Sequence, residues 1–318
     1  MPMDHVSFES KHFTIEPLAQ GVFGAVHREG GWAIANAGIV DLGETCLVFD
    51  TFLTPAAGAD LRRAAETLTG VPVRYVINSH YHNDHIWGNQ AFAPETIILS
   101  SAKSQRLIET KGQEEYDWYL ENSAKRLAEL DKALAEASNE EEKQALKFWI
   151  GYYQALAVSM PGLELRRPEL TFKSKLKLRG ANRRVEILSF ERGHTGGDTI
   201  LHIPGESIVF TADLLFVGSH PYLPDGDPAA LVDALGVIKD MEPEILLPGH
   251  GSVGGHADLD TMLQYIHDCE RIAQGFAETG IDTKGDDFVM PEIYASWEYP
   301  NFFRANVSHF IQEHSSGK

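Results

Sequence analysis

Six consecutive residues starting at His80 read His-Tyr-His-Asn-Asp-His and carry four groups that can bind a metal ion. One residue separates them from residues 73–78, an apolar run that predicts a short buried strand. Side chains two positions apart in an extended segment point the same way, so His80 and His82 can reach one ion. Asp84 and His85 can serve a second ion if the chain turns there. The segment therefore predicts a metal site at the end of a strand.

Three more potential ligands follow, each at the end of an apolar run. His194 lies in Gly-His-Thr-Gly-Gly-Asp, Asp213 ends Phe-Thr-Ala-Asp, and His250 lies in Leu-Pro-Gly-His-Gly. Glycines beside two of these positions permit tight turns. A single histidine after a strand is usually structural, but four such sites in this order indicate one shared metal centre.

This order of motifs, H-x-H-x-D-H, G-H-T-x-G, T-x-D and P-G-H-G, resembles the metallo-β-lactamase superfamily. The resemblance implies an α/β chain folded as a four-layer αβ/βα sandwich, with two divalent metal ions in a shallow cleft at the sheet edge. By position, the first metal would be bound by His80, His82 and His194, the second by Asp84, His85 and His250, and Asp213 would bridge the two.

The chemistry follows from the two ions. They would lower the pKa of a shared water, and the bridging hydroxide would attack a small ester, thioester, lactone or amide. Asp84 is the candidate catalytic residue, because its free oxygen could orient the hydroxide. Thr195 and Asp198 are expected to fix His194 and neighbouring loops, with a purely structural role for Asp198 left open. We expect zinc, with iron or manganese as alternatives.

The residues at two positions separate branches of the superfamily. Asp213 resembles the bridging residue of the glyoxalase II, thioesterase and lactonase branches, so β-lactam hydrolysis is not expected to be the main activity. His82 replaces the Glu of the flavodiiron reductases, so that branch is not expected.

Two alternative functions stay open. One is a mononuclear iron sulfur dioxygenase. The other is a metal-binding protein without catalysis, although the complete ligand set argues against it. Only 36 residues (214–249) separate Asp213 from His250, so the nuclease insertion of RNA-processing members is absent.

Charge and composition limit the classes of binding partner that we expect. The chain has 318 residues and a net charge of −19, which disfavours nucleic acid and anionic membranes as partners, so a phosphodiesterase or nuclease is not favoured. Its two cysteines lie far apart, and Cys46 falls in a predicted buried strand. The N-terminal residues have no signal-peptide pattern and no apolar run is long enough to span a membrane, so we expect a cytoplasmic protein acting on a small molecule.

The chain is interpreted as one domain over residues 1–318, with a helical insertion at about 101–160 and a C-terminal helical extension at about 282–318. The insertion is nearly free of Gly and Pro and has apolar residues at helical spacing. It is a candidate lid, or the surface of a possible homodimer. Strands are predicted at residues 14–16, 22–27, 33–40, 46–49, 73–78, 175–178, 185–190, 199–203, 207–210 and 244–247, and helices at 55–68, 228–239 and 259–278.

Substrate contacts are the least constrained part of the sequence. Trp87 follows the metal-binding segment, and His220 and Tyr222 follow Asp213, so all three are candidates for substrate binding. Packing within loops is the alternative for Trp87 and Tyr222. One of the tyrosines on the second inserted helix could also reach the site if the insertion is a lid.

Overall fold

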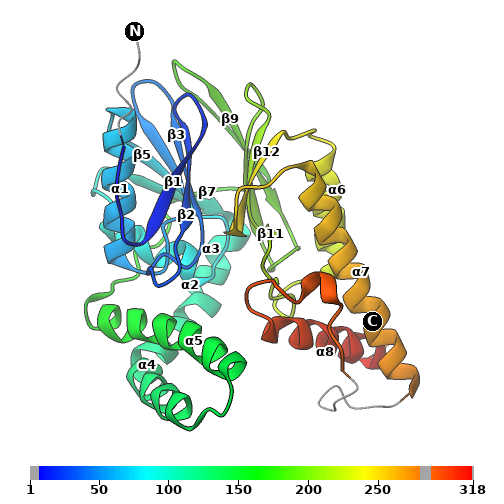
Figure 1. Ribbon diagram of the computed structural model, residues 1–318. Coiled ribbons are helices and arrows are strands. Elements are labelled where there is room, and N and C mark those ends of the chain that lie inside the picture. The colour runs from blue at the N-terminus through cyan, green and yellow to red at the C-terminus, as the bar shows by residue number, and fades with distance from the viewer. Residues whose placement is uncertain (1–6, 280–287, 317–318) are drawn as a thin grey trace.

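The computed structural model describes residues 7–279 and 288–316. Two β-sheets face each other, and helices cover their outer sides (Figure 1). This arrangement confirms the predicted α/β sandwich. The first six residues of the predicted C-terminal extension, 282–287, lie outside the described residues.

The first sheet runs in the order β1-β2-β3-β4-β5-β6-β7. Its first four strands are antiparallel, as predicted, and β4 to β7 are parallel. The strand predicted from residue 33 begins later, because residues 33–36 are irregular and Ile34 has a φ of 69°. The short strands β6 and β7 were not predicted. The bounds are β1 Phe13–Ala19, β2 Val22–His27, β3 Ala37–Asp41, β4 Cys46–Phe49, β5 Val73–Ile77, β6 Ile97–Ser101 and β7 Leu170–Phe172.

The second sheet runs in the order β12-β11-β10-β9-β8, with β11 parallel to β12 and the other pairs antiparallel. β11 is longer than predicted and continues past two register shifts around Ala212, whose φ is 45°. Such shifts re-aim the side chains beside them. The bounds are β8 Lys175–Arg179, β9 Arg184–Phe190, β10 Asp198–Ile203, β11 Ile208–Val217 and β12 Ile245–Gly251.

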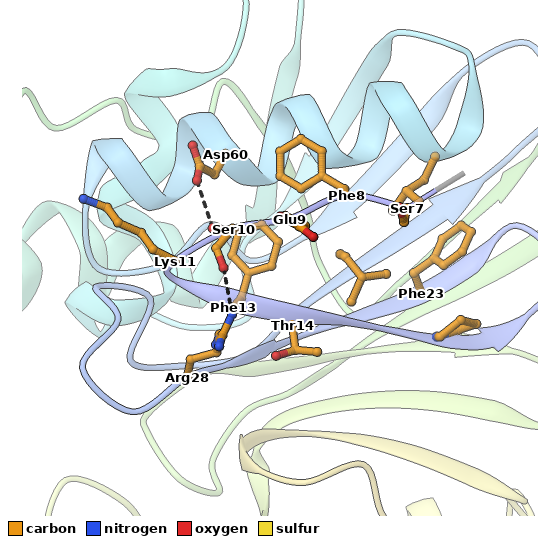
Figure 2. Close-up of a pocket in the computed structure, with 13 residues that line it drawn as sticks. Ser7, Phe8, Glu9, Ser10, Lys11, Phe13, Thr14, Phe23, Arg28 and Asp60 are labelled. Atoms are coloured by element: carbon orange, nitrogen blue, oxygen red, sulfur yellow. Dashed lines mark hydrogen bonds between the residues drawn. The ribbon is translucent and has the colours of Figure 1, made fainter. Parts of the chain in front are cut away.

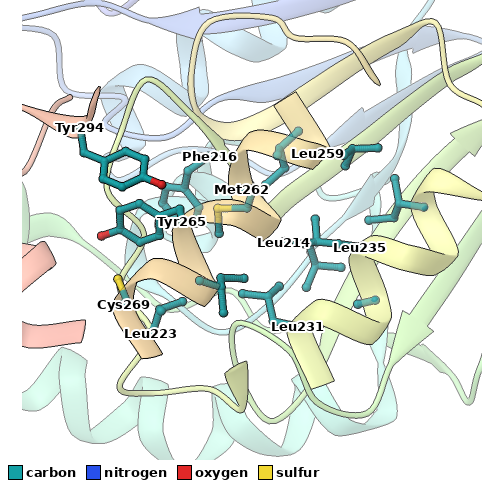
Figure 3. Packing of buried hydrophobic residues seen from close by; sticks show 14 of the residues in the cluster. Leu214, Phe216, Leu223, Leu231, Leu235, Leu259, Met262, Tyr265, Cys269 and Tyr294 are labelled. Atoms are coloured by element: carbon teal, nitrogen blue, oxygen red, sulfur yellow. The ribbon is translucent and has the colours of Figure 1, made fainter. Parts of the chain in front are cut away.

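The layers are held together by three apolar cores. Helix α1 (Pro55–Thr69) is capped by the Thr54 side chain at its start and by Gly70 at its end, and its buried face covers the first sheet. A second core fills the space between the sheets and joins side chains such as Phe49 and Phe210. The third core lies between the second sheet and helices α6 (Pro228–Lys239) and α7 (His256–Thr279), where Leu235, Met262 and Tyr265 meet (Figure 3).

The predicted insertion contains three helices: α3 (Ala102–Glu109), α4 (Lys111–Glu136) and α5 (Glu140–Ser159). α4 and α5 form a hairpin that lies below the sheets in Figure 1. Their apolar faces pack on α2 (Asn83–Ile86) and on the short helix η1 (Trp87–Ala91), so the hairpin rests on the segment that carries the predicted ligands. The short helix η2 (Met160–Gly162) follows α5.

The C-terminal part crosses back toward the same region. The short helix η3 (Glu292–Tyr294) precedes α8 (Asn301–Ser316), which packs on α7. Phe303 is buried there in the third core, whereas Tyr299 and Phe302 face the insertion. Within the described ranges, none of the helices combines the length and apolar character needed to cross a bilayer.

A surface hollow near the N-terminus is formed by residues other than the predicted metal ligands. It is lined by the N-terminal segment, β1 and α1, with Phe8, Phe13 and Phe23 among its walls (Figure 2). None of its lining residues belongs to the predicted ligand set.

Candidate metal centre

The first histidines emerge where β5 ends. After Ile77 the chain leaves the sheet, and His82 takes an extended conformation (φ −62°, ψ 145°) directly before α2. The turn into α2 then carries Asp84 and His85 away from His82. The sequence thus produces the expected division of this segment into two pairs of side chains.

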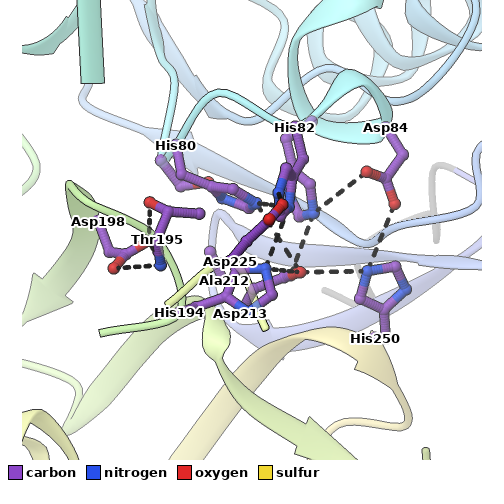
Figure 4. Close-up of polar contacts among 12 residues, drawn as sticks. His80, His82, Asp84, His194, Thr195, Asp198, Ala212, Asp213, Asp225 and His250 are labelled. Carbon is purple, nitrogen blue, oxygen red and sulfur yellow. Dashed lines mark hydrogen bonds and ion pairs between the residues drawn. The ribbon is translucent and has the colours of Figure 1, made fainter. Parts of the chain in front are cut away.

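Three imidazoles converge on one point (Figure 4). His82 Nδ1 lies 3.0 Å from His80 Nε2 and 3.1 Å from His194 Nε2. His80 and His194 are almost completely buried. Burial lowers the pKa of His80 well below its ordinary value and that of His194 to about 3, so both rings favour the neutral form that binds metals.

The other predicted ligands form a second group beside the first. Asp84, His85 and His250 offer ligand atoms that all lie within 4.8 Å of one another. Asp213 contacts both groups: its Oδ2 is 3.2 Å from His194 Nε2 and 3.5 Å from His250 Nε2, and its Oδ1 is 3.1 Å from His85 Nε2. The structure therefore brings all seven predicted ligands together.

These residues fit divalent ions. His85 Nε2 and Asp213 Oδ1 are buried without a hydrogen-bond partner among the described residues, although they lie close to each other. Unpaired buried polar atoms are costly, and a coordinated cation removes that cost. The donor set of imidazole and carboxylate groups is the kind that binds zinc, iron or manganese.

Asp50 fixes the orientation of two of these histidines. It follows β4 and is fully buried. His85 Nδ1 lies 2.8 Å from Asp50 Oδ2, so its proton points to the carboxylate and Nε2 is left free. Ser79 Oγ donates to the same Oδ2 at 2.7 Å and therefore accepts from His80 Nδ1 at 2.9 Å. His80 thus also presents a free Nε2.

Asp225 has the same role for His82, and sequence reasoning missed it. Its Oδ2 lies 3.1 Å from His82 Nε2 and accepts the Tyr81 hydroxyl at 2.9 Å. The proton on Nε2 leaves His82 Nδ1 free to face the other two imidazoles. Asp225 lies in the loop before α6, where Pro-Asp-Gly-Asp-Pro has the composition of an ordinary turn.

Asn36 holds the end of β12, which carries His250. Its backbone N–H donates to Gly249 O at 2.7 Å, and its side-chain amide donates to Pro248 O at 3.0 Å and Gly251 O at 2.8 Å. Gly249 itself has no room for a side chain, because a Cβ there would overlap Asp213 Oδ1. The glycine predicted to allow a turn therefore also allows the close approach of Asp213.

Thr195 and Asp198 close the loop around His194. The Asp198 carboxylate accepts the Thr195 N–H and, at 2.7 Å, the Thr195 hydroxyl. Burial raises the pKa of Asp198 to about 6. Neither residue bonds to the His194 ring, whose Nδ1 has no partner among the described residues, so their effect on it passes through the loop backbone.

The predicted substrate contacts lie mostly away from the ligands. Trp87 is buried against Tyr116 and Tyr119 of the insertion. His220 is also fully buried and uses both ring nitrogens, on Tyr265 OH at 2.9 Å and Tyr294 O at 3.2 Å. Their positions in the core do not support the prediction that they contact substrate.

Other aromatic side chains surround the ligand group instead. The Phe216 ring stacks on His250 with centroids 5.1 Å apart, and the Tyr299 ring lies 6.1 Å from it. Tyr299 has a φ of 61°, an uncommon value for a bulky residue, and its ring contacts Phe148 of the insertion at 4.6 Å. Tyr222 packs on Phe302, 5.3 Å between centroids, at the edge of this cluster.

One carboxylate of the insertion also faces the ligands. Glu115 lies on α4, and its Oε2 atom is buried without a hydrogen-bond partner among the described residues. Burial raises the pKa of Glu115 to about 8, against the opposing effect of His82, and the neighbouring Asp84 and Asp225 add to the rise. It was not predicted, because one Glu in a charged helix carries no signal of its own.

Comparison with known families identifies this arrangement. The family model of the metallo-beta-lactamase superfamily matches residues 30–250, which is more than half of the chain and spans every ligand described above. The chain belongs to the metallo-β-lactamase superfamily. No curated protein sequence matches it significantly.

Solved structures of superfamily members share the fold. A metallo-beta-lactamase from Pontibacter korlensis superposes with a TM-score of 0.57 at 16% identity and covers 79% of this chain and 97% of its own. The metallo-beta-lactamase FIM-1 from Pseudomonas aeruginosa, in a mono-zinc form, has a TM-score of 0.56 at 18% identity, with 80% and 94% covered. One from Erythrobacter litoralis has a TM-score of 0.57 at 14% identity, with 81% and 97% covered. At such identities the likeness concerns the fold alone.

Proposed function

We propose that this superfamily member is a hydrolase that uses two divalent metal ions to cleave a small ester, thioester, lactone or amide. Zinc is the metal that we expect. The observation that carries the proposal is the position of Asp213, whose two oxygens contact histidines of both ligand groups. A single carboxylate between two ligand groups suits a pair of ions that share it.

The ions, when bound, would supply a nucleophile by lowering the pKa of a water toward neutrality and would polarise the substrate carbonyl. The protein's own residues hold this arrangement in place. Asp50 and Asp225 set the protonated nitrogen of three ligand imidazoles. Asp84, whose Oδ2 lies 3.4 Å from His250 Nε2, would orient the attacking water through its other oxygen.

The cysteines support a water nucleophile over a covalent thiol mechanism. Cys46 and Cys269 are both buried, and burial raises the pKa of each thiol to about 12. A thiolate nucleophile needs a lowered pKa and access to the substrate, so neither cysteine suits that role.

The test combines metal analysis with a substrate panel. Purified protein is analysed for bound metals and assayed on chromogenic esters, thioesters, lactones and a β-lactam. We expect about two zinc or manganese ions per chain, and loss of turnover by at least about 100-fold in Asp213→Ala. The matched control is Asp233→Ala, because Asp233 is exposed on α6.

One result would replace the proposal with another activity. A single iron per chain, no hydrolysis, and oxygen uptake with a persulfide would favour the sulfur dioxygenase instead. Metal binding with no turnover of either kind would favour a binding protein.

A further inference from the structure

Tyr299 contacts both a predicted metal ligand and the insertion. Measured between ring centroids, it lies 6.1 Å from His250 and 4.6 Å from Phe148 on α5. It belongs to the chain between η3 and α8, which pairs with the residues after β11 through a bridge between Ser219 and Glu298 (Figure 1). The insertion and the C-terminal part of the chain thus meet beside His250.

The backbone on both sides holds Tyr299 in an uncommon conformation. Its φ of 61° is rare for a bulky residue. Before it, the Glu298 N–H donates to Gly218 O at 3.0 Å, and Glu298 O accepts from the His220 N–H at 2.9 Å. After it, the Phe302 N–H donates to Tyr299 O at 2.9 Å. Such a conformation persists only where the surrounding contacts fix it, and it is frequent at functional sites.

The Tyr299 hydroxyl is a donor that the protein leaves unused. No hydrogen bond joins it to another of the described residues, and the side chain keeps part of its surface exposed. Two other phenols near the ligands differ, because the Tyr81 hydroxyl donates to Asp225 and the Tyr152 hydroxyl to Tyr119. A phenol is protonated at neutral pH and can donate one hydrogen bond. The hydroxyl is therefore available to a molecule that enters from solvent.

This hydroxyl is also close to the ligand groups. Burial raises the pKa of Tyr299 well above its ordinary value, and the charges of Glu298, Asp84 and Asp213 add to the rise. Asp213 belongs to the first ligand group and Asp84 to the second. A substrate whose cleaved bond lies at these groups would therefore bring its own oxygen atoms toward the hydroxyl.

The rings around Tyr299 indicate what surrounds such an oxygen. Phe302 lies 5.7 Å from the Tyr299 ring, and Phe148 lies on the insertion side of it. Both phenylalanines keep part of their surface exposed. Uncharged rings favour an apolar substrate group, and aromatic pairs gain more than their buried area alone provides. These surroundings therefore suit a substrate with an aromatic group.

We propose that Tyr299 contacts the substrate: its hydroxyl donates a hydrogen bond to an oxygen of the group that is cleaved, and its ring, with those of Phe148 and Phe302, lies against an aromatic substrate group. This inference rests on the proposed hydrolase function. It narrows the substrate class to small uncharged esters, thioesters, lactones or amides with an aromatic group near the cleaved bond. The insertion and the segment before α8 then both contribute to specificity.

The experiment compares two thioesters that differ in whether one ring is aromatic, S-ethyl 3-phenylpropanethioate and S-ethyl 3-cyclohexylpropanethioate. We expect wild-type protein to prefer the phenyl compound about 2- to 10-fold in kcat/KM. Tyr299→Phe should lose about 10-fold on both compounds and keep the preference, whereas Tyr299→Leu should lose the preference as well. Tyr75→Phe is the matched control, because Tyr75 packs against the core between the sheets and belongs to neither ligand group.

A binding measurement separates this inference from the proposed function. The ketone 4-phenylbutan-2-one has a carbonyl and an aromatic ring but no bond to cleave, and its binding to the zinc-loaded protein is followed by NMR titration. Weaker binding to Tyr299→Phe than to wild type, at equal zinc content, supports the inference even if neither thioester is cleaved, which would count against the proposed function alone. Equal binding by the two proteins, or loss of zinc in Tyr299→Phe, would overturn the contact between hydroxyl and substrate. Equal cleavage of both thioesters by wild type would overturn the aromatic substrate group.

Discussion

The Asp225 carboxylate lies 3.1 Å from Nε2 of His82, on the side of the ring opposite the nitrogen that faces His80 and His194. A loop far along the chain thus determines which nitrogen of His82 is free to bind a metal. The Tyr81 hydroxyl, 2.9 Å from the same oxygen, fixes the carboxylate in turn.

Replacing this carboxylate tests its positioning role. Asp225→Asn removes the charge that holds the His82 ring and permits the other tautomer, so we expect metal affinity to fall by about 10- to 100-fold. Competition with a chromophoric chelator measures the affinity directly, without reference to activity. Asp233→Asn on the exposed face of α6 should leave it unchanged. An Asp225→Asn protein that binds zinc as tightly as wild type would contradict the assignment.

Asn36 links the first sheet to the end of β12 through three hydrogen bonds. Asn36→Ala leaves the carbonyls of Pro248 and Gly251 without their donor, so we expect the free energy of unfolding to fall by about 2 kcal/mol, with weaker metal binding as well. Urea denaturation measures the first effect. Asn182→Ala, which removes an exposed side-chain bond to Asp41, should change stability by no more than about 0.5 kcal/mol.

The Gly249→Ala variant tests whether the close approach of β12 to Asp213 is needed for metal binding. A methyl group in Gly249→Ala would overlap Asp213 Oδ1, so the carboxylate must move away from its place between the two ligand groups. We expect the amount of bound metal to fall together with any hydrolysis, as in Asp213→Ala. Gly255→Ala is the control, since a Cβ there meets only Glu244 O at an ordinary 3.6 Å. Full metal occupancy in Gly249→Ala would show that β12 or Asp213 can move to make room for the methyl group.

The ligand set could be predicted from the sequence because each ligand lies at the end of an apolar run or shortly after one, although Asp213 and His250 lie inside the observed strands β11 and β12. Apolar runs mark the strands, and polar residues near their ends, such as His194 and His250, both come close to Asp213. Asp50 has the same signal, directly after the buried strand β4, and could have been found. The fold class was implied by the resemblance of the motif order to the superfamily, and the short predicted strands agree with it.

The rest depends on contacts that no local pattern encodes. Asp225 meets His82 across 143 positions of the chain, and its turn-like surroundings give no hint of the partner. Glu115 stands among many exposed charges on α4 and differs from Glu114 only through the way the hairpin rests on α2. For His220 the sequence suggested a role that the packing does not support. Its position after β11 suggested a substrate contact, but the side chain is buried in the core.

The two thiols provide a test that depends on pH. Burial raises the pKa of Cys46 and Cys269 to about 12, whereas an unfolded thiol ionises near ~8.5. At about pH 8 the folded protein should therefore not react with a disulfide reagent, and both thiols should react in denaturant. The unfolded state loses these protons first, so the thiols make stability fall as pH rises above ~8.5. Rapid labelling of the native protein would contradict this prediction.

Removal of the metals tests whether the seven ligands act as one site. Ions that bind only the folded chain stabilise it by about 2.7 kcal/mol at a free concentration one hundred times Kd. We therefore expect a chelator to lower the unfolding temperature by several degrees, and added zinc to restore it. Asp213→Asn removes the charge shared by both groups and should shrink this shift, while Asp233→Asn should keep it. The carboxylates of Asp84 and Asp213 lie within 3.5 Å of His250 Nε2, and an ion there offsets their mutual repulsion. A chelator that leaves the unfolding temperature unchanged in wild type would mean that the site is held by the protein alone.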